Sequence, residues 1–351
     1  MSKEIILGKR KIAEKEPCFI IGEVAQGHDG SLGIAHAYID AIADVGADAV
    51  KFQTHIADAE STLEESWRIP FSFQDKNRYD YWKRMEFTSE QWIELKRHSE
   101  DRKLIFLSSP FSIEAAEMLY KMEITAWKIA SGEVNNFLLL DYIKSTRLPC
   151  LVSTGMSSLA RVDEIIKDLK AKKIEYGIFQ CTTSYPCPPE KIGLNMLEYF
   201  SGRYGCPVGL SDHSGCIYPG LSAVSLGCQM LEVHVTFSKK MFGPDTTASL
   251  TVEQLGQIVE GIRYIEKMKD NPIDKNIFSK KAEGLSKMFS RSIALKHSLP
   301  AGTVLTEKYL TLKKPGTGIA PDRFKEIIGC RLRRDVHYNV LLTEEDLEEE
   351  R

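Results

Sequence analysis

Eight short apolar runs recur within the first 270 residues of this chain, and segments with helical spacing separate most of them. Continuous apolar strands that alternate with helices indicate a parallel sheet covered on both faces. Eight such units favour a closed (β/α)₈ TIM barrel, of the α/β class, over an open doubly wound sheet, and no G-x-G-x-x-G motif follows the first run. The predicted strands are residues 19–23, 49–53, 104–108, 126–131, 150–154, 176–180, 208–211 and 231–234.

The chain changes character after residue 270, where a second, smaller domain is predicted. Residues 271–290 are polar and predict a linker, and short β-like runs then alternate with turns that contain Pro and Gly. We therefore expect a catalytic barrel at 1–270, a linker at 271–290 and a small β-rich domain at 291–351. Its acidic end, 344–350, predicts a solvated tail. The β-like runs are residues 292–295, 303–305 and 310–312.

One connection within the barrel region, residues 54–88, is unusually long and rich in aromatic residues. Connections of this length at the carboxyl ends of barrel strands are typical of lids or of walls of a binding site. We expect one of these roles, with a plain packed excursion as the alternative.

The overall charge limits the classes of partner. A net charge of -3 argues against a general binder of nucleic acid, although it allows a local basic pocket. The N-terminus shows no signal-peptide pattern, and no apolar run approaches the roughly 20 residues of a membrane span. The eight cysteines form no C-x-x-C pair, which is typical of a reducing cytoplasm. We expect a cytoplasmic protein that acts on small molecules, with no nucleic acid or membrane partner.

Almost every predicted strand ends in a polar or charged side chain, and in a TIM barrel these ends build the active site. Lys51 and Lys128 are the most informative, because an unpaired ammonium group inside an apolar strand is costly to bury. Together with nearby hydroxyl groups they predict a site for a phosphate and a carboxylate. Two alternatives stay open: lysines that pair with Glu23 and Glu133 for structure only, and a lysine that forms a Schiff base. The hydroxyl groups belong to Ser109, Ser131, Thr154 and Ser211.

Two histidines, His213 and His234, stand at the ends of the last two predicted strands. Because neighbouring parallel strands bring their carboxyl ends together, the two imidazoles are expected to meet. Neutral imidazole suits Mn²⁺, Fe²⁺, Co²⁺ or Zn²⁺, and two histidines leave positions open for substrate oxygens. The pair predicts a catalytic metal, with ordinary core histidines as the alternative. His28, in a loop, is expected to contact the substrate or support the metal ligands, and the other histidines, His55 among them, carry no specific signal.

A set of short motifs spans nearly the whole chain. They read Gly-Glu at 22–23, Lys-Phe-Gln-Thr at 51–54, Ser-Ser-Pro-Phe-Ser at 108–112, Trp-Lys-Ile-Ala-Ser-Gly-Glu at 127–133, Ser-Thr-Gly-Met at 153–156, Gly-Leu-Ser-Asp-His at 209–213, Glu-Val-His at 232–234 and Gly-Pro-Asp at 243–245. These stretches resemble the sialic acid (N-acetylneuraminate) synthase family, the bacterial nonulosonic acid synthases. Residues 291–347, with Lys-Pro-Gly-Thr-Gly at 314–318, resemble the family's antifreeze-like SAF domain, a β-clip fold.

The resemblance implies a transferase that condenses phosphoenolpyruvate with an N-acylated hexosamine such as N-acetylmannosamine, giving a nine-carbon sialic-type acid and phosphate. His213 and His234 would hold a divalent metal, Mn²⁺ first, with Mg²⁺ or Co²⁺ as options, to polarise the sugar aldehyde. Glu133 would activate water as a general base. The implied catalytic residues are Glu133, Glu23, Lys51 and Lys128. Phosphoenolpyruvate would be held by Lys51, Ser109, Lys128, Ser131, Thr154 and Ser211. The sugar would be held by Glu23, Gln53, Tyr185, Asp245 and Lys314.

The resemblance also implies a domain-swapped homodimer, in which the SAF domain of one subunit caps the barrel of the other. Three positions depart from the family pattern: Lys314 stands where arginine is usual, Gly27 replaces an asparagine before His28, and Thr183 replaces another asparagine. The acceptor could therefore be N-acetylmannosamine, a 2,4-diacetamido sugar or another hexose derivative. Alternative functions are a related 3-deoxy sugar acid synthase acting on a phosphorylated aldose, and a non-catalytic sugar-binding protein of polysaccharide assembly.

Overall fold

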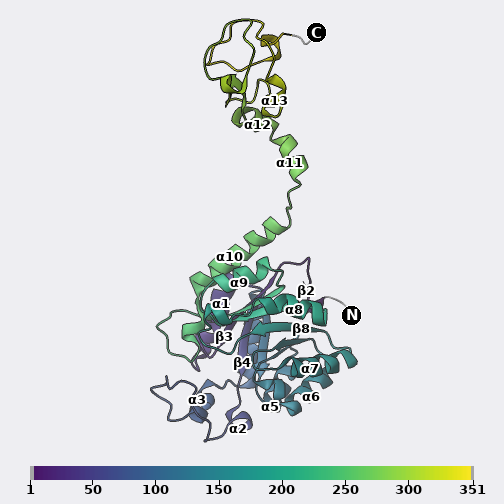
Figure 1. Cartoon of the computed structure of the whole chain (residues 1–351). Coiled ribbons are helices and arrows are strands. Elements are labelled where there is room, and N and C mark those ends of the chain that lie inside the picture. Colours follow the sequence, from purple (N-terminus) through teal and green to yellow (C-terminus); the bar gives the residue numbers. More distant parts are fainter. Residues whose placement is uncertain (1–3, 349–351) are drawn as a thin grey trace. The chain divides into compact units, whose positions relative to one another are not determined.

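The computed structural model describes residues 4–348, which fall into two compact units that divide between Asp270 and Asn271 (Figure 1). Within 4–348, no helix combines the length and apolarity that crossing a bilayer requires. No disulfide joins the eight cysteines, all of which lie in this range.

The first unit is a nearly closed barrel of eight parallel strands, which confirms the predicted TIM barrel. Its first and last strands are hydrogen-bonded neighbours, with Glu23 in register with His234, and this pairing distinguishes the barrel from an open sheet. The remaining neighbours follow in the order β5-β4-β3-β10-β9-β8-β7-β6, and β5 lies beside β6 to complete the circle. The strands are β3 (Phe19–Ala25), β4 (Ala49–Thr54), β5 (Ile105–Pro110), β6 (Trp127–Ile129), β7 (Cys150–Ser153), β8 (Tyr176–Cys181), β9 (Val208–Asp212) and β10 (Met230–Thr236), and the short β11 (Leu250–Thr251) pairs with β10.

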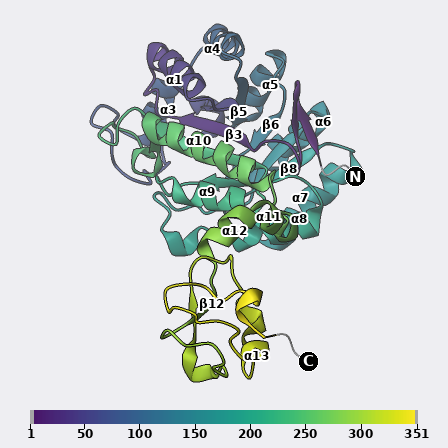
Figure 2. The same cartoon turned by 90° about the horizontal axis from the view of Figure 1, so that it is seen from above.

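Helices surround the strands, as Figure 2 shows. Their first turns begin where the sequence offers a cap: the Ser31 side chain accepts from Ile34 N–H, and Thr251 with Gln254 forms the predicted capping box of the last helix. Their apolar stripes face the strands and are buried. The helices are α1 (Leu32–Asp44), α4 (Ser89–Asp101), α5 (Ile113–Lys121), α6 (Phe137–Thr146), α7 (Leu159–Ala171), α8 (Asn195–Tyr204), α9 (Tyr218–Ser225) and α10 (Val252–Lys269).

The interior of the barrel is stacked in two layers of different character. At the amino-terminal end a short hairpin, β1 (Ile5–Leu7) and β2 (Arg10–Ile12), packs its apolar side chains against inward-facing strand residues. Gly209 is required in this layer, because a Cβ there would lie 2.5 Å from the ring of Phe179. Side chains on one face of a strand recur every second residue, so the next inward layer begins two positions further on. The apolar strand residues are Phe19, Ile21, Ala49, Leu107, Ala126, Leu151, Phe179 and Met230.

The long connection after β4 contains two short helices, α2 (Ala57–Glu60) and α3 (Arg78–Met85). Tyr81 and Trp82 are buried within it, and Trp67 and Phe71 pack against them. This segment therefore has a small aromatic core of its own.

The second unit begins with two short helices and differs from the predicted one in two places. The helices, α11 (Lys275–Lys281) and α12 (Glu283–Phe289), lie within residues 271–290, which were predicted as a polar linker. The expected strand at 303–305 is reduced to one bridge from Val304 to Arg331. The acidic end is tied down rather than solvated, because the carboxylate of Asp346 is buried and accepts from Arg334 and Thr343; residues 349–350 of the predicted tail lie outside the described range.

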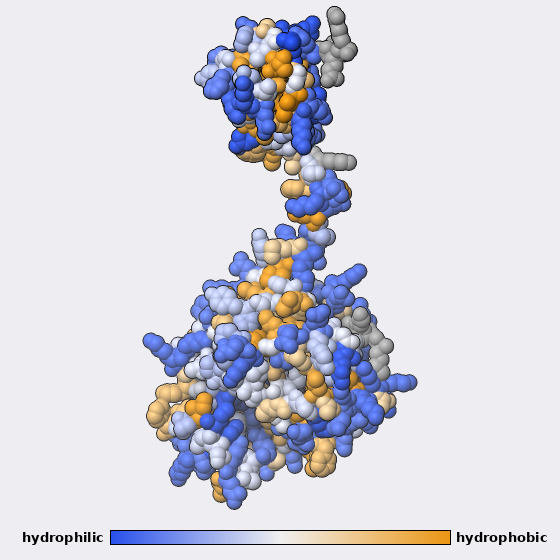
Figure 3. Space-filling view, viewed as in Figure 1, coloured by the Kyte–Doolittle hydropathy of each residue, from blue (hydrophilic) through white to orange (hydrophobic). Residues whose placement is uncertain are grey.

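The remaining elements of this unit are small, as expected for a turn-rich domain. The antiparallel strands β12 (Ser292–Leu295) and β13 (Leu310–Lys313) pair over an apolar cluster, followed by the short helix α13 (Phe324–Ile327). Apolar side chains on and just before α11 and α12 are exposed, as Figure 3 shows in orange. Each is at least 53% exposed: Ile273, Ile277, Phe278, Leu285, Met288 and Phe289.

Candidate active site

A cavity of about 400 Å³ opens at the carboxyl ends of the barrel strands. Most of the predicted site residues line it, each two or four positions beyond the apolar layer of its strand or in the loop that follows. The segment after β4 adds aromatic side chains to the wall, which agrees with the predicted wall of a binding site. The predicted residues that line the cavity are Glu23, Lys51, Gln53, Ser109, Lys128, Ser131, Glu133, Tyr185, Ser211, His213, His234 and Asp245.

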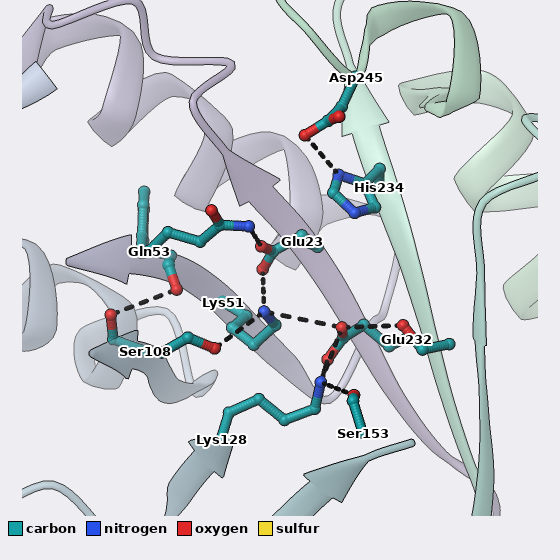
Figure 4. Close-up of polar contacts among 12 residues, drawn as sticks. Glu23, Lys51, Gln53, Ser108, Lys128, Ser153, Glu232, His234 and Asp245 are labelled. Carbon is teal, nitrogen blue, oxygen red and sulfur yellow. Dashed lines mark hydrogen bonds and ion pairs between the residues drawn. The ribbon is translucent and has the colours of Figure 1, made fainter. Parts of the chain in front are cut away.

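Two buried lysines share one carboxylate at the floor of this cavity (Figure 4). The Lys128 ammonium lies 3.0 Å from both carboxylate oxygens of Glu232. Lys51 lies 3.6 Å from the same residue and 2.9 Å from Glu23, its register partner on β3. The alternative in which Lys128 pairs with Glu133 is therefore wrong, and Glu232 takes that place.

The shared carboxylate sets the protonation of the cluster. Burial opposes ionisation of Glu232, but Lys128 and Lys51 outweigh it and lower its pKa to about 2. Lys51 has two carboxylates, which raise its pKa against the effect of burial, whereas Lys128 has only one and burial lowers its pKa. Burial raises the pKa of Glu23 despite the nearby Lys51.

Hydroxyl groups surround the two ammonium groups. Lys128 donates to Ser153 at 2.9 Å, Lys51 donates to Ser109 at 3.5 Å, and Ser211 donates to Glu232 at 3.1 Å. Ser131 lines the same cavity.

Thr154 does not line this cavity, contrary to the sequence assignment. Its hydroxyl donates to the backbone oxygen of Phe179 at 3.0 Å. The residue before it, Ser153, stands two positions after Leu151 and so holds the inward place on β7.

The two histidines meet as expected, with ring centroids 5.2 Å apart. His213 Nδ1 lies 2.9 Å from the backbone oxygen of Thr182 and donates to it, so its Nε2 carries the lone pair. That nitrogen lies 3.3 Å from the Tyr185 hydroxyl and 3.5 Å from the hydroxyl of Ser211. Ser211 and the two imidazoles thus belong to one continuous site.

The histidine pair fits a divalent metal in its chemistry. Burial, with the other imidazole second, lowers the pKa of His213 to about 4, and burial lowers the pKa of His234, so both rings are neutral near pH 7 and can ligate. A carboxylate oxygen of Asp245 lies 3.9 Å from His234 Nδ1. Across residues 4–348 no group of three or more His, Cys, Asp or Glu side chains is arranged to hold a metal ion.

An arginine that the sequence analysis missed organises the rim. Arg68, from the segment after β4, donates to Asp245 at 2.6 Å and to the oxygen of Pro244 at 2.8 Å. Its guanidinium also lies 4.4 Å from the centre of the Tyr185 ring. Arg68 therefore contacts Tyr185 and Asp245, two of the residues that the resemblance assigns to the sugar. Nothing in its local sequence marks it, because it stands in an irregular loop.

Glu133 lies at the cavity wall in a short 3₁₀ helix after β6, where Asn136 donates to its carboxylate at 2.9 Å. Burial raises its pKa despite that hydrogen bond. A carboxylate of raised basicity near open space suits proton transfer.

Two predicted residues lie elsewhere. His28 is buried against Phe87, with ring centroids 4.7 Å apart, and is not part of the cavity lining, so its expected contact with substrate is wrong. Lys314 belongs to the second unit, where its ammonium lies 5.5 Å from the ring centre of Phe289, and its role toward the sugar stays a prediction.

Besides Arg68, two functional candidates were missed, Glu232 and His55, and the sequence held a clear signal for the first. Glu232 is an acid inside an apolar strand and stands two positions before His234, so alternation places both on the inward face. His55, which the sequence analysis set aside, lines the cavity together with Gln26. It follows β4 directly, and only its position two residues after Gln53 could have suggested this.

Comparison with known proteins places this geometry among related chains. Residues 38–274 match the NeuB family model, and residues 290–348 match the SAF domain. The N,N'-diacetyllegionaminic acid synthase of Campylobacter jejuni is 31% identical over 88% of this chain and 94% of its own length. Human N-acetylneuraminate-9-phosphate synthase is 29% identical over 96% and 94%. The crystal structure of an N-acetylneuraminic acid synthetase from Leptospira borgpetersenii, at 28% identity, superimposes with a TM-score of 0.71 over 82% of this chain and 98% of its own.

Proposed function

The chain belongs to the NeuB family and carries a SAF domain, and we propose that it is a synthase that joins phosphoenolpyruvate to an N-acylated hexosamine, giving a nonulosonic acid and phosphate. The names of its relatives, synthases of diacetyllegionaminic acid and of N-acetylneuraminate 9-phosphate, support this product class. The observation that carries the proposal is the pair of buried lysines beside seryl hydroxyls, in one cavity with two histidines.

The floor of the cavity would hold phosphoenolpyruvate. Lys51 and Lys128 converge on one point, since both lie within 3.6 Å of Glu232. Ammonium and hydroxyl donors at such a point would bind the phosphate and carboxylate through charge-assisted hydrogen bonds. Because the donors are fixed before the substrate arrives, they would also stabilise the charge that develops as phosphate leaves.

His213 and His234 would hold the metal, for which Mn²⁺ is our first choice and Mg²⁺ or Co²⁺ are options. When bound, the ion would supply Lewis-acid polarisation of the sugar carbonyl. The chain's own contribution is orientation: the Thr182 carbonyl fixes the His213 ring, and Asp245 faces His234.

The remaining side chains would handle the acceptor and the water. Tyr185, Asp245, Gln53 and Glu23 would contact the sugar between the histidines and the segment after β4. Asn136 donates to one oxygen of Glu133, which leaves the other oxygen to take a proton from the water that adds to the donor.

We also propose a cytoplasmic homodimer in which the SAF domain of one subunit covers the barrel of another and brings Lys314 to the sugar. The exposed apolar side chains of α11 and α12 support an interface there. Light scattering after size exclusion should give a dimer for the wild type and a monomer for the double variant Leu285→Glu/Met288→Glu. A double variant that stays dimeric would place the interface elsewhere.

The decisive experiment is mass spectrometry of products from phosphoenolpyruvate, Mn²⁺ and a panel of acceptors. The panel contains N-acetylmannosamine, its 6-phosphate, a 2,4-diacetamido hexose, arabinose 5-phosphate and erythrose 4-phosphate. We expect one sialic-type acid and one phosphate per turnover with an acylated hexosamine. Lys128→Met should abolish turnover, whereas Lys167→Met, an exposed residue of α7, should not.

Three outcomes would contradict the proposal. Absence of phosphate release with every acylated hexosamine would refute it. Turnover confined to the phosphorylated aldoses would assign the chain to the related 3-deoxy sugar acid synthases. Sugar binding without turnover would favour a non-catalytic protein.

A further inference from the structure

His55 is a buried residue of the cavity to which no role has yet been given. Its ring lies between two aromatic rings, 4.0 Å from Trp82 and 4.4 Å from Phe111 between centroids, and is tilted by less than 20° from each. Both ring nitrogens also have partners: Nδ1 lies 2.6 Å from Glu60 Oε1, and Nε2 lies 2.9 Å from Gln26 Nε2 and 3.4 Å from Gln53 Oε1. The imidazole is therefore fixed on both faces and at both nitrogens.

The shortest contacts around His55 give one direction of hydrogen bonding. Gln26 Nε2 lies 2.6 Å from Gln53 Oε1 as well as 2.9 Å from His55 Nε2, and an amide nitrogen can only donate. Because Gln26 Nε2 lies nearer to His55 Nε2 than Gln53 Oε1 does, His55 Nε2 accepts from Gln26, and the ring hydrogen is on Nδ1 and points to Glu60. Gln53, whose oxygen is occupied by Gln26, donates through Nε2 to Glu23 at 2.8 Å.

We propose that His55 is a positioning residue, which orients the amides of Gln26 and Gln53 so that Gln53 presents its N–H to Glu23. This inference rests on the proposed function, because Gln53 and Glu23 are assigned there to the acceptor sugar. A hydrogen on Nε2 of His55 would face the N–H of the Gln26 amide. That amide would then rotate by half a turn and exchange the positions of its oxygen and nitrogen. The Gln26 oxygen would then face the Gln53 oxygen, and Gln53 would in turn direct its own oxygen at the carboxylate of Glu23.

The same series of hydrogen bonds connects the segment after β4 to the floor of the cavity. Glu60 ends α2 in that segment, and Glu23 is the residue that pairs with Lys51. All five residues of this series are buried or half-buried and line one cavity. The segment thereby influences the orientation of Gln26 and Gln53, and through Gln53 the hydrogen bond to Glu23.

Three substitutions separate positioning from simple packing. His55→Gln keeps an acceptor for Gln26 and a donor for Glu60. His55→Asn keeps only a donor near the position of Nδ1. His55→Phe keeps an aromatic ring between Trp82 and Phe111 and has no polar atom.

Steady-state kinetics should rank these variants by their hydrogen bonds. We expect His55→Phe to raise the KM for the acceptor about tenfold, the loss of roughly one hydrogen bond, and His55→Gln to raise it least. The KM for phosphoenolpyruvate should stay within about twofold of the wild type in all three. His36→Phe, in α1 and outside the cavity lining, is the matched control and should change neither value. If packing alone mattered, the order would reverse and His55→Phe would be the mildest variant.

A second measurement does not depend on turnover. In ¹⁵N-histidine-labelled wild-type protein, the His55 signals are assigned by their absence in the His55→Phe variant. We expect the neutral Nδ1–H form, with Nε2 unprotonated. A ring protonated at Nε2 overturns the proposal. If no acylated hexosamine is converted, the proposed function fails, and this spectrum still decides the orientation of His55.

Discussion

Replacing Glu232 by glutamine would remove one negative charge from the floor of the cavity while keeping the shape of the side chain. Lys51 would retain Glu23 at 2.9 Å, but Lys128 would retain only neutral acceptors, the hydroxyl of Ser153 and the amide oxygen at position 232. Lys128 is 2% exposed, so its ammonium would be buried without a counter-charge. We expect Glu232→Gln to lower the free energy of unfolding of the barrel.

The distances give the size of the effect. At an effective dielectric constant of about 20, separations of 3.0 and 3.6 Å from Lys128 and Lys51 correspond to about 5.5 and 4.6 kcal/mol of attraction. The cost of burying the carboxylate in the wild type offsets much of this, and removing one partner of a buried pair costs about 3–5 kcal/mol. A loss of about 3 kcal/mol corresponds to a Tm about 6–12 °C lower.

Urea unfolding followed by tryptophan fluorescence measures this loss for the barrel alone, because Trp67, Trp82, Trp92 and Trp127 are the four tryptophans of the chain and all precede residue 271. Glu232→Gln, Lys128→Met and their double variant form a cycle, and we expect the double variant to lose at least about 2 kcal/mol less than the sum of the single variants.

The surface pair of half-buried Lys96 and exposed Glu100 provides the control for this cycle. Glu100→Gln should cost less than about 1 kcal/mol. If the losses in free energy of unfolding simply add in the double variant of Glu232 and Lys128, the two side chains do not stabilise each other and the reasoning is refuted.

Three further predictions test other parts of the structure. Burial lowers the pKa of His28 from 6.5 to about 3, so the unfolded chain binds more protons than the folded one between these values and the free energy of unfolding falls as the pH is lowered through this window. In urea unfolding, His28→Asn should therefore reduce by about 2 kcal/mol the difference between the free energies of unfolding at pH 7 and pH 5, and an unchanged difference would contradict this. His234→Ala should abolish the rise in Tm that MnCl₂ produces, and a retained rise would place the ion elsewhere. Leu7→Ala, in the hairpin at the base of the barrel, should cost about 3 kcal/mol by calorimetry, whereas a loss below about 1 kcal/mol would show that the hairpin is dispensable.

The barrel could be predicted because its strands are buried on both faces, so each appears as an unbroken apolar run. The same reasoning located Lys51 and Lys128, since a charge inside such a run needs a special environment. It did not identify Glu232, because a single acid in a strand does not reveal its partners until the order of the strands is known. Thr154 was preferred to Ser153 because the alternation of side chains is ambiguous by one residue at a strand end.

The small elements were harder to predict for different physical reasons. The hairpin of β1 and β2 has strands of three residues, too short for a period to show. The residues of α11 and α12 are polar enough to suggest a linker, and their apolar side chains are exposed within this chain. Asp346 looked like part of a solvated tail because its partner Arg334 lies 12 positions away, beyond any local pattern.

The hairpin at the base of the barrel has a consequence for the order of events in catalysis. Ile5, Leu7 and Ile12 are fully buried there and cover the amino-terminal end of the barrel, so substrates would enter at the opposite end, past the rim where Arg68 lies. Under the proposed function the donor must reach the lysines before the acceptor occupies the space above them. Phosphate, formed at the same depth, must wait for the sugar acid to depart. The fold thus imposes an ordered mechanism, in which the ligand that binds first occupies the floor and the product formed there is released last.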